Sequence, residues 1–340
     1  MKPTQYVTFM KECLINNPKQ PIFLHGSMGI GKSEITKQIS DDLNFDEFID
    51  IRLSLLDAVD LRGLPTYDAK TNQTRWSQPC FLPPMGTKKN ILLFFDEFSN
   101  ASPSIQNACL QLMLDRKIGE YELSDSVRIV CAGNTLKDGA YVFKMSAPLN
   151  NRFIHINLDV DFEDFKKWAY NHNINPMVMG FLNFRRDLLF NYKEDIENNA
   201  FPTPRTWFFI HRLMELKLEN GTLLEAVKGT IGEGAGIEFY SFMKIYRDLP
   251  NPEDILYKNK DIVPKEASQR YAIVSAILSI VAKDDKVLNR AIEYSMKLPK
   301  EFSVLFMQDL LKFQHLRTKI TMNNKAFDKW IKENKEFIID

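Results

Sequence analysis

The sequence lacks a net charge, because its 44 lysines and arginines balance its 44 aspartates and glutamates. Proteins that hold nucleic acid or a lipid surface over a wide area carry a basic excess, so the composition indicates neither partner. The sequence also lacks a secretory signal and any apolar run near the roughly 18 residues that span a bilayer. We therefore expect a cytoplasmic protein with no part in a membrane.

Cysteine is scarce, and its spacing gives no indication of a metal or redox site. Four cysteines lie at positions 13, 80, 109 and 131, without a C-x-x-C pair. Cys109 falls on the apolar face of a predicted helix and Cys131 in an apolar strand, so both are expected to be reduced thiols in the core. The five histidines show no spacing typical of metal ligands. A disulfide-stabilised secreted protein is therefore excluded.

A glycine-rich stretch at residues 26–33 follows the pattern G-x-x-x-x-G-K-[ST]. The stretch comes directly after an apolar run at 21–25 and directly before a helical apolar pattern at 35–43. Strand, glycine loop and helix together are typical of a phosphate-binding loop, and a glycine-rich turn without a ligand is the alternative. The predicted nucleotide-binding residues are Gly26, Ser27, Met28, Gly29, Ile30, Gly31, Lys32 and Ser33.

The residue types of this loop suit a nucleotide triphosphate. Backbone N–H groups freed by the glycines converge on phosphate oxygens, and the start of a helix adds a favourable partial charge. Lys32 would reach the β- and γ-phosphates, and the Ser33 hydroxyl would be a ligand of Mg²⁺. The pattern therefore predicts ATP and Mg²⁺ as cofactors, although a preference for ATP over GTP stays open.

A pair of carboxylates follows a second apolar run, Ile91-Leu-Leu-Phe-Phe95, which is typical of a strand buried on both faces. Ligands bind at the carboxyl ends of the strands in open α/β sheets, where Asp96 and Glu97 are expected to lie. Asp96 would hold Mg²⁺ together with Ser33, and Glu97 would polarise the attacking water. Alone, the two residues could simply end a strand, but their order after the phosphate loop favours a site.

A third apolar run, at 127–132, ends in Gly133 and Asn134. An asparagine just past a strand beside the carboxylate strand could hydrogen-bond the γ-phosphate or the attacking water. An Asx turn at the strand end is the alternative.

The phosphate loop, the Asp-Glu strand, the asparagine, Asn151-Arg152-Phe153 and Pro202-Thr203-Pro204-Arg205 together resemble the motifs of the AAA+ ATPases. The resemblance covers about residues 1–245. It is greater to the MoxR and dynein-related branch, including the CbbQ/NorQ type and the MoxR-like ATPases of bacteriophages. The stretches that indicate this branch are 57–65, 100–113 and 148–153.

The resemblance implies roles for three more residues. Asn134 falls on the sensor-1 position, and Arg152 is similar to the arginine finger that reaches the γ-phosphate of a neighbouring subunit. Such a finger typically raises the rate by about 10³–10⁵. Arg205 is similar to sensor 2, which contacts the nucleotide from a helical lid, and Thr203 and Pro204 are suited to begin its helix. An ordinary surface salt bridge is the alternative for Arg152.

The expected fold class is α/β. Residues 1–160 would form an AAA+ nucleotide-binding domain with a parallel sheet flanked by helices, 161–248 an all-α lid, and 249–340 a C-terminal helical extension. Within 55–84 we expect an inserted hairpin that pairs 64–67 with 74–76, a position where inserts of MoxR-like relatives face the pore of a ring.

The resemblance implies a ring, of six subunits, that hydrolyses Mg-ATP and acts as a chaperone-like remodelling or maturation factor on a protein client. A partner with a von Willebrand factor A domain is common among such relatives. Two alternatives stay open: a nucleic-acid motor, which the balanced charge argues against, and a nucleotide-dependent assembly switch that hydrolyses slowly. The sequence identifies neither client nor source.

Overall fold

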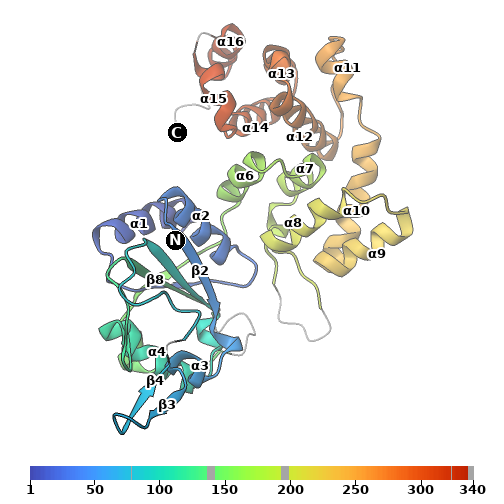
Figure 1. Cartoon of the computed structure of the whole chain (residues 1–340). Helices are drawn as coiled ribbons and strands as arrows, with labels where there is room; N and C mark the ends of the chain where they lie inside the picture. Colours follow the sequence, from blue (N-terminus) through green and yellow to red (C-terminus); the bar gives the residue numbers. More distant parts are fainter. Residues whose placement is uncertain (78, 136–141, 193–198, 323, 336–340) are drawn as a thin grey trace. The chain divides into compact units, whose positions relative to one another are not determined.

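The structure is a computed structural model that describes residues 1–77, 79–135, 142–192, 199–322 and 324–335. The chain forms two compact units, Met1–Val160 and Asp161–Asp340 (Figure 1). None of the helices in the described parts of the chain combines the length and the apolar character that crossing a membrane requires.

The first unit is built on a five-stranded sheet in the order β2-β5-β8-β1-β9. Every pair of neighbouring strands in this sheet is parallel, which confirms the predicted fold class. Because the strands are parallel, the segments that follow them meet at one edge of the sheet. The strands are β1 (Ile22–His25), β2 (Glu47–Arg52), β5 (Ile91–Asp96), β8 (Val127–Gly133) and β9 (Ile154–Asn157).

Helices cover both faces of this sheet, because the side chains of a strand alternate between the two faces. Leu92 and Phe94 of β5 pack in one buried cluster with Tyr6 of α1 (Pro3–Asn16) and Ile39 of α2 (Lys32–Asp42). The intervening side chains form a second cluster on the other face, which includes α4 (Pro103–Asp115). The apolar run of β5 is therefore buried on both faces, as its sequence predicts.

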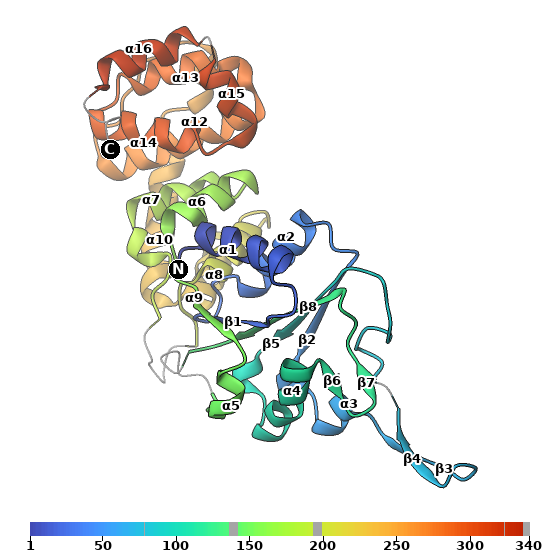
Figure 2. The same cartoon turned by 90° about the vertical axis from the view of Figure 1, so that its left-hand side faces the viewer.

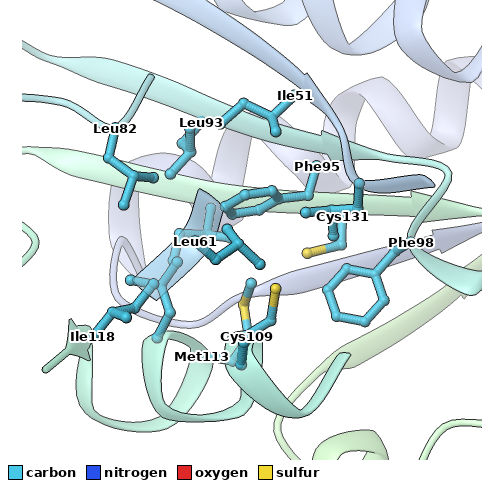
Figure 3. Packing of buried hydrophobic residues seen from close by; sticks show 14 of the residues in the cluster. Ile51, Leu61, Leu82, Leu93, Phe95, Phe98, Cys109, Met113, Ile118 and Cys131 are labelled. Carbon is cyan, nitrogen blue, oxygen red and sulfur yellow. The ribbon is translucent and has the colours of Figure 1, made fainter. Parts of the chain in front are cut away.

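The second cluster contains the two cysteines that were expected in the core. Cys131 of β8 and Cys109 of α4 are free thiols, and both are fully buried. Figure 3 shows them among Phe95, Phe98 and Met113. Burial raises the pKa of Cys109 to about 12, so this thiol stays protonated and unreactive at neutral pH.

Two short hairpins extend the first unit. Strands β3 (Pro65–Asp68) and β4 (Gln73–Trp76) pair antiparallel, which confirms the hairpin predicted in the insert, and they project away from the sheet (Figure 2). Pro65, Tyr67 and Trp76 lie on the same face of this hairpin because of its register. Strands β6 (Lys117–Ile118) and β7 (Tyr121–Glu122) form the other hairpin. Short helices α3 (Ala58–Arg62) and α5 (Ala147–Asn150) complete the unit.

The described part of the second unit contains helices and no strand, as the pattern after residue 160 predicts. Helix α7 comes so close to α12 that a Cβ at Gly180 would lie 3.3 Å from Ala272 Cα. The helices are α6 (Phe162–Asn171), α7 (Pro176–Phe184), α8 (Pro204–Leu213), α9 (Asn220–Ile231), α10 (Glu233–Arg247), α11 (Pro252–Tyr257), α12 (Ala267–Lys283), α13 (Leu288–Ser295), α14 (Lys300–Leu310), α15 (Gln314–Thr321) and α16 (Lys325–Glu333).

A buried polar cluster joins helices on both sides of residue 249. Asp309 of α14 is fully buried, and its carboxylate lies 2.5 Å from the ammonium nitrogen of Lys166 on α6. The same carboxylate accepts hydrogen bonds from the Tyr170 hydroxyl, at 2.7 Å, and from the Asn183 amide, at 3.3 Å. The predicted lid segment and the predicted extension therefore share a set of interior contacts.

Candidate functional site

The phosphate-loop stretch lies between β1 and α2, at the carboxyl edge of the sheet, and Lys32 is the first residue of α2. Gly29 and Gly31 have φ angles of 73° and 93°, in the left-handed region that glycine adopts without steric cost. Helix α2 begins directly after these glycines with no side-chain hydrogen bond capping its start, and the first N–H groups of such a helix are suited to hold an anion.

Lys32 lies within the loop instead of extending into solvent. Its side chain is only 8% exposed, and Nζ donates to the carbonyl oxygens of Gly26, at 2.7 Å, and Ser27, at 3.0 Å. Nζ also donates to Oδ1 of Asn134, at 3.0 Å. The lysine of the first motif and the asparagine of the third are therefore in direct contact.

Ser33 joins the first motif to the second. Its hydroxyl donates to Oδ2 of Asp96 at 2.7 Å. A hydroxyl and a carboxylate oxygen are hard ligands that suit Mg²⁺, which commonly takes only one or two protein ligands and completes its shell with phosphate and water. No cluster of three or more His, Cys, Asp or Glu side chains suited to a metal occurs among the described residues. The donor set thus fits a magnesium ion bound together with a phosphate ligand.

Carboxylates are concentrated at this edge. The pKa of Asp50 on β2 is raised above its usual value, mainly by burial and next by the charge of Asp96, while Arg52 opposes the shift and Glu97 adds to it. A bound cation would lower the free energy of such a group of carboxylates in their charged form. The electrostatics of the edge therefore favour a metal ion at Asp96.

Glu97 has an unusual backbone for its residue type, with φ 55° and ψ 30°. A non-glycine residue in this left-handed region costs roughly 1–2 kcal/mol. Its N–H donates to Oδ1 of Asp96 at 2.8 Å, and its carboxylate accepts a hydrogen bond from the Ser54 hydroxyl. These two contacts fix the direction of the Glu97 side chain beside Asp96.

Asn134 is fixed by two residues that the sequence did not indicate. Its N–H donates to the Ser99 hydroxyl oxygen at 2.9 Å, and its Nδ2 donates to Oδ1 of Asn100 at 3.4 Å. A Cβ on the preceding Gly133 would lie 2.7 Å from the Ser99 hydroxyl oxygen, so only glycine fits there. With Oδ1 bonded to Lys32, the side-chain amide of Asn134 faces the phosphate loop.

Arg152 follows α5 at the start of β9, and its side chain is half-buried. Its Nε is buried and has no hydrogen-bond partner among the residues that the structure describes. The side chain also forms no salt bridge within those residues, so a surface ion pair does not occupy this guanidinium. Its backbone carbonyl accepts from the Gln20 side chain at 2.8 Å.

Arg205 is an exposed residue in the first turn of α8, in the second unit. The Thr203 hydroxyl accepts from the Thr206 N–H at 3.1 Å and Pro204 is the first helical residue, so the helix begins as its sequence predicts. The contact of Arg205 with a nucleotide stays a prediction.

The geometry thus brings Lys32, Ser33, Asp96, Glu97 and Asn134 together at the ends of β1, β5 and β8. Ser54, Ser99 and Asn100, which hold Glu97 and Asn134, were missed. Ser54 lies two residues after the end of β2, whose neighbour in the sheet is β5. Its place near Glu97 could therefore be predicted only with the order of the strands in hand.

One known protein family is similar to this part of the chain. Residues 21–153 match the AAA domain of the dynein-related subfamily. The matched segment begins just before β1 and ends just after Arg152, so it contains the phosphate loop, the Asp96–Glu97 pair and Asn134. No match was found among curated proteins.

Several solved structures are similar to the chain at low sequence identity. A candidate ATPase of Cytophaga hutchinsonii is 14% identical over 97% of this chain and 88% of its own, with a TM-score of 0.37. A RuvB variant of Thermotoga maritima is 13% identical over 83% of both chains, with a TM-score of 0.41. A protein of Thermotoga maritima related to the gamma subunit of DNA polymerase III is 14% identical over 97% of this chain and 98% of its own, with a TM-score of 0.35.

Proposed function

We propose that the chain is a Mg-ATP hydrolase of the AAA+ type, in the MoxR-like branch, which works as a subunit of a ring. The observation that carries this proposal is the convergence of Lys32, Ser33, Asp96 and Asn134 within hydrogen-bond distance at one sheet edge. These residues lie in the segment that matches the dynein-related AAA domain. Phosphoryl transfer requires positioned charges more than covalent chemistry, and this edge offers them.

Each residue would have one task in hydrolysis. The N–H groups of residues 26–33 and the Lys32 ammonium would hold the β- and γ-phosphates. Ser33 and Asp96 would hold Mg²⁺, which neutralises charge that develops on the phosphate oxygens. Glu97 would orient the attacking water and take its proton, and the amide of Asn134 would hydrogen-bond the γ-phosphate or this water.

The side chain of Arg152 supports a ring. A half-buried arginine whose Nε has no hydrogen-bond partner among the described residues is suited to meet an anion that another molecule brings. In the proposed ring, of six subunits, Arg152 would contact the γ-phosphate held by the neighbour. Arg205 would contact the nucleotide of its own subunit from the helical unit, so that lid movement follows the state of the nucleotide.

We propose a protein client for this movement, with a partner that carries a von Willebrand factor A domain, in the cytoplasm. The projecting β3–β4 hairpin supports a polypeptide client, because Tyr67 and Trp76 on its apolar face are 67% and 43% exposed. Exposed aromatic side chains of this kind commonly mark a surface that contacts protein. The balanced charge of the chain gives no support to nucleic acid as the substrate.

The variant Lys32→Ala tests the nucleotide site, with Lys37→Ala as its matched control on the exposed face of the same helix. Because Lys32 is to bind phosphate through charge-assisted hydrogen bonds, we expect affinity for a fluorescent ATP analogue to fall at least about 100-fold. Isothermal titration with ATP and GTP in the presence of Mg²⁺ measures the same loss and shows which base is preferred.

Lys37→Ala should bind nucleotide as the unaltered chain does. Tight ATP binding by Lys32→Ala would show that residues 26–33 are not the phosphate site.

A further inference from the structure

Two histidines on neighbouring strands form a hydrogen-bonded pair beside the phosphate loop. His25 is the last residue of β1, directly before Gly26, and His155 lies on β9. His25 Nε2 lies 2.8 Å from His155 Nδ1, and His155 Nε2 lies 2.8 Å from the backbone oxygen of Asn150. The pair therefore forms a continuous polar connection between β1 and the end of α5.

The backbone carbonyl of Asn150, at the end of this connection, determines which nitrogen donates and which accepts in each of its hydrogen bonds. A carbonyl oxygen only accepts, so His155 Nε2 must carry a proton and donate it to Asn150. His155 Nδ1 is then the acceptor in a neutral ring, and His25 Nε2 must be the donor. His25 is suited to be neutral, because burial, then His155 and then Lys32 lower its pKa to about 4.

Aromatic packing holds both rings in place. The two imidazoles lie edge to edge, with centroids 5.1 Å apart and planes 25° apart, and the centroid of the Phe23 ring lies 4.4 Å from that of His25. Phe153, the residue after Arg152, places its ring 5.9 Å from that of His155. The pair is therefore an ordered connection, although His155 is an exposed side chain.

The connection ends at the turn that carries Arg152. The oxygen of Asn150 accepts from His155 and also from the Phe153 N–H, at 3.3 Å. Arg152 lies between Asn150 and Phe153 in the chain, so it is part of this turn. The Arg152 N–H bonds the oxygen of Leu149, at 3.1 Å. Loss of the His155 bond would leave the Phe153 N–H, at 3.3 Å, as the remaining donor among the described residues to the carbonyl around which the Arg152 turn is built, and would loosen this turn.

We propose that His155 is a positioning residue for Arg152, and that the His25–His155 pair couples the phosphate loop of a subunit to the arginine that it presents. This inference rests on the proposed function, because it takes Arg152 to act on a nucleotide. His155 touches no nucleotide in this account and acts only through the Arg152 turn.

The variants His155→Leu and His155→Gln test the proposal. Leucine removes both hydrogen bonds, whereas the amide of glutamine retains a donor for Asn150 and an acceptor for His25. Because both hydrogen bonds that hold the Arg152 turn to the pair are lost, we expect His155→Leu to lower kcat for ATP roughly ten-fold or more with little change in KM. His155→Gln should recover a large part of the loss.

A double-variant cycle shows whether the effect passes through Arg152. His155→Leu should have no further effect on kcat once Arg152→Ala is present. Equal effects in both backgrounds, or a normal kcat in His155→Leu, would overturn the proposal.

Mixed subunits separate this inference from the proposed function. In mixed rings, His155→Leu should regain activity with Lys32→Ala subunits, which keep an intact Arg152 turn, and not with Arg152→Ala subunits. The opposite pattern would mean that His155 supports its own phosphate loop, and would overturn the proposal. A chain that hydrolyses no nucleotide before any substitution would instead contradict the proposed function.

Discussion

At the scale of single residues, Glu97 shows how the site holds the side chain that we propose orients the attacking water. Its left-handed backbone conformation is unfavourable for a non-glycine residue, and a residue that only ends a strand does not need to adopt it. The residue is nevertheless fixed on two sides, by Asp96 through its N–H and by Ser54 through its carboxylate. A strained residue that is held by hydrogen bonds at its N–H and at its carboxylate is typical of a site that positions a reacting group.

We expect Glu97→Gln to bind ATP normally and to hydrolyse it at most about a hundredth as fast. The amide keeps the shape and the contact with Ser54 but cannot take a proton from water, and loss of a general base typically costs about 10²–10⁴ in rate. Single-turnover hydrolysis measures the rate, and titration with ATP measures the affinity.

Glu122→Gln, at an exposed residue of the β6–β7 hairpin, is the matched control and should leave the rate unchanged. Turnover by Glu97→Gln at the rate of the unaltered chain would remove Glu97 from the mechanism.

At the scale of helices and strands, local patterns could be predicted and distant pairings could not. The phosphate loop is a short motif between a strand and a helix, and Asp96 directly follows an apolar run, so both were found from neighbouring residues. The β3–β4 hairpin closes over a short polar turn and was found in the same way. Residues that depend on which strands are neighbours were missed.

The contacts that position the site depend on pairings between strands that are distant in the chain. Ser54 meets Glu97 only because β2 lies beside β5, and His25 meets His155 only because β9 lies beside β1. No periodicity or spacing in the sequence gives the order of strands that are far apart in the chain. The clustering of the main site residues could therefore be predicted, but not the residues that hold them.

A buried ion pair joins two helices of the second unit, and its loss should be measurable. We expect Lys166→Met to lower the free energy of unfolding by about 3 kcal/mol, because it leaves Asp309 as a buried charge with fewer partners. Urea unfolding of the full chain, followed by circular dichroism, measures the loss in the transition of the helical unit.

The double variant Lys166→Met/Asp309→Asn should be less destabilised, since it removes the uncompensated charge and keeps an acceptor for Tyr170. Lys167→Met, at the exposed neighbour on α6, is the control and should change little. An equal cost for Lys166→Met and Lys167→Met would show that the pair contributes nothing.

At the scale of the whole molecule, the account depends on a second subunit. The first unit supplies a phosphate loop, two carboxylates and an asparagine at one edge, yet its Arg152 guanidinium has no partner among the described residues. A trans-acting arginine explains both facts at once, since the charge it would neutralise is brought by a neighbour. The helical unit would then link the state of the nucleotide to movement of a client.

The most direct test of this account mixes two variants that alone should hydrolyse ATP far more slowly than the unaltered chain, Arg152→Ala and Lys32→Ala, and measures ATP hydrolysis at different ratios, with light scattering to follow the assembly. A ring with trans-acting arginines would regain activity, because Lys32→Ala subunits supply an arginine to neighbours that still bind ATP. Random mixing at equal amounts completes about a quarter of the interfaces, so we expect up to about a quarter of the original rate. Assembled rings that stay inactive at every ratio would contradict the account.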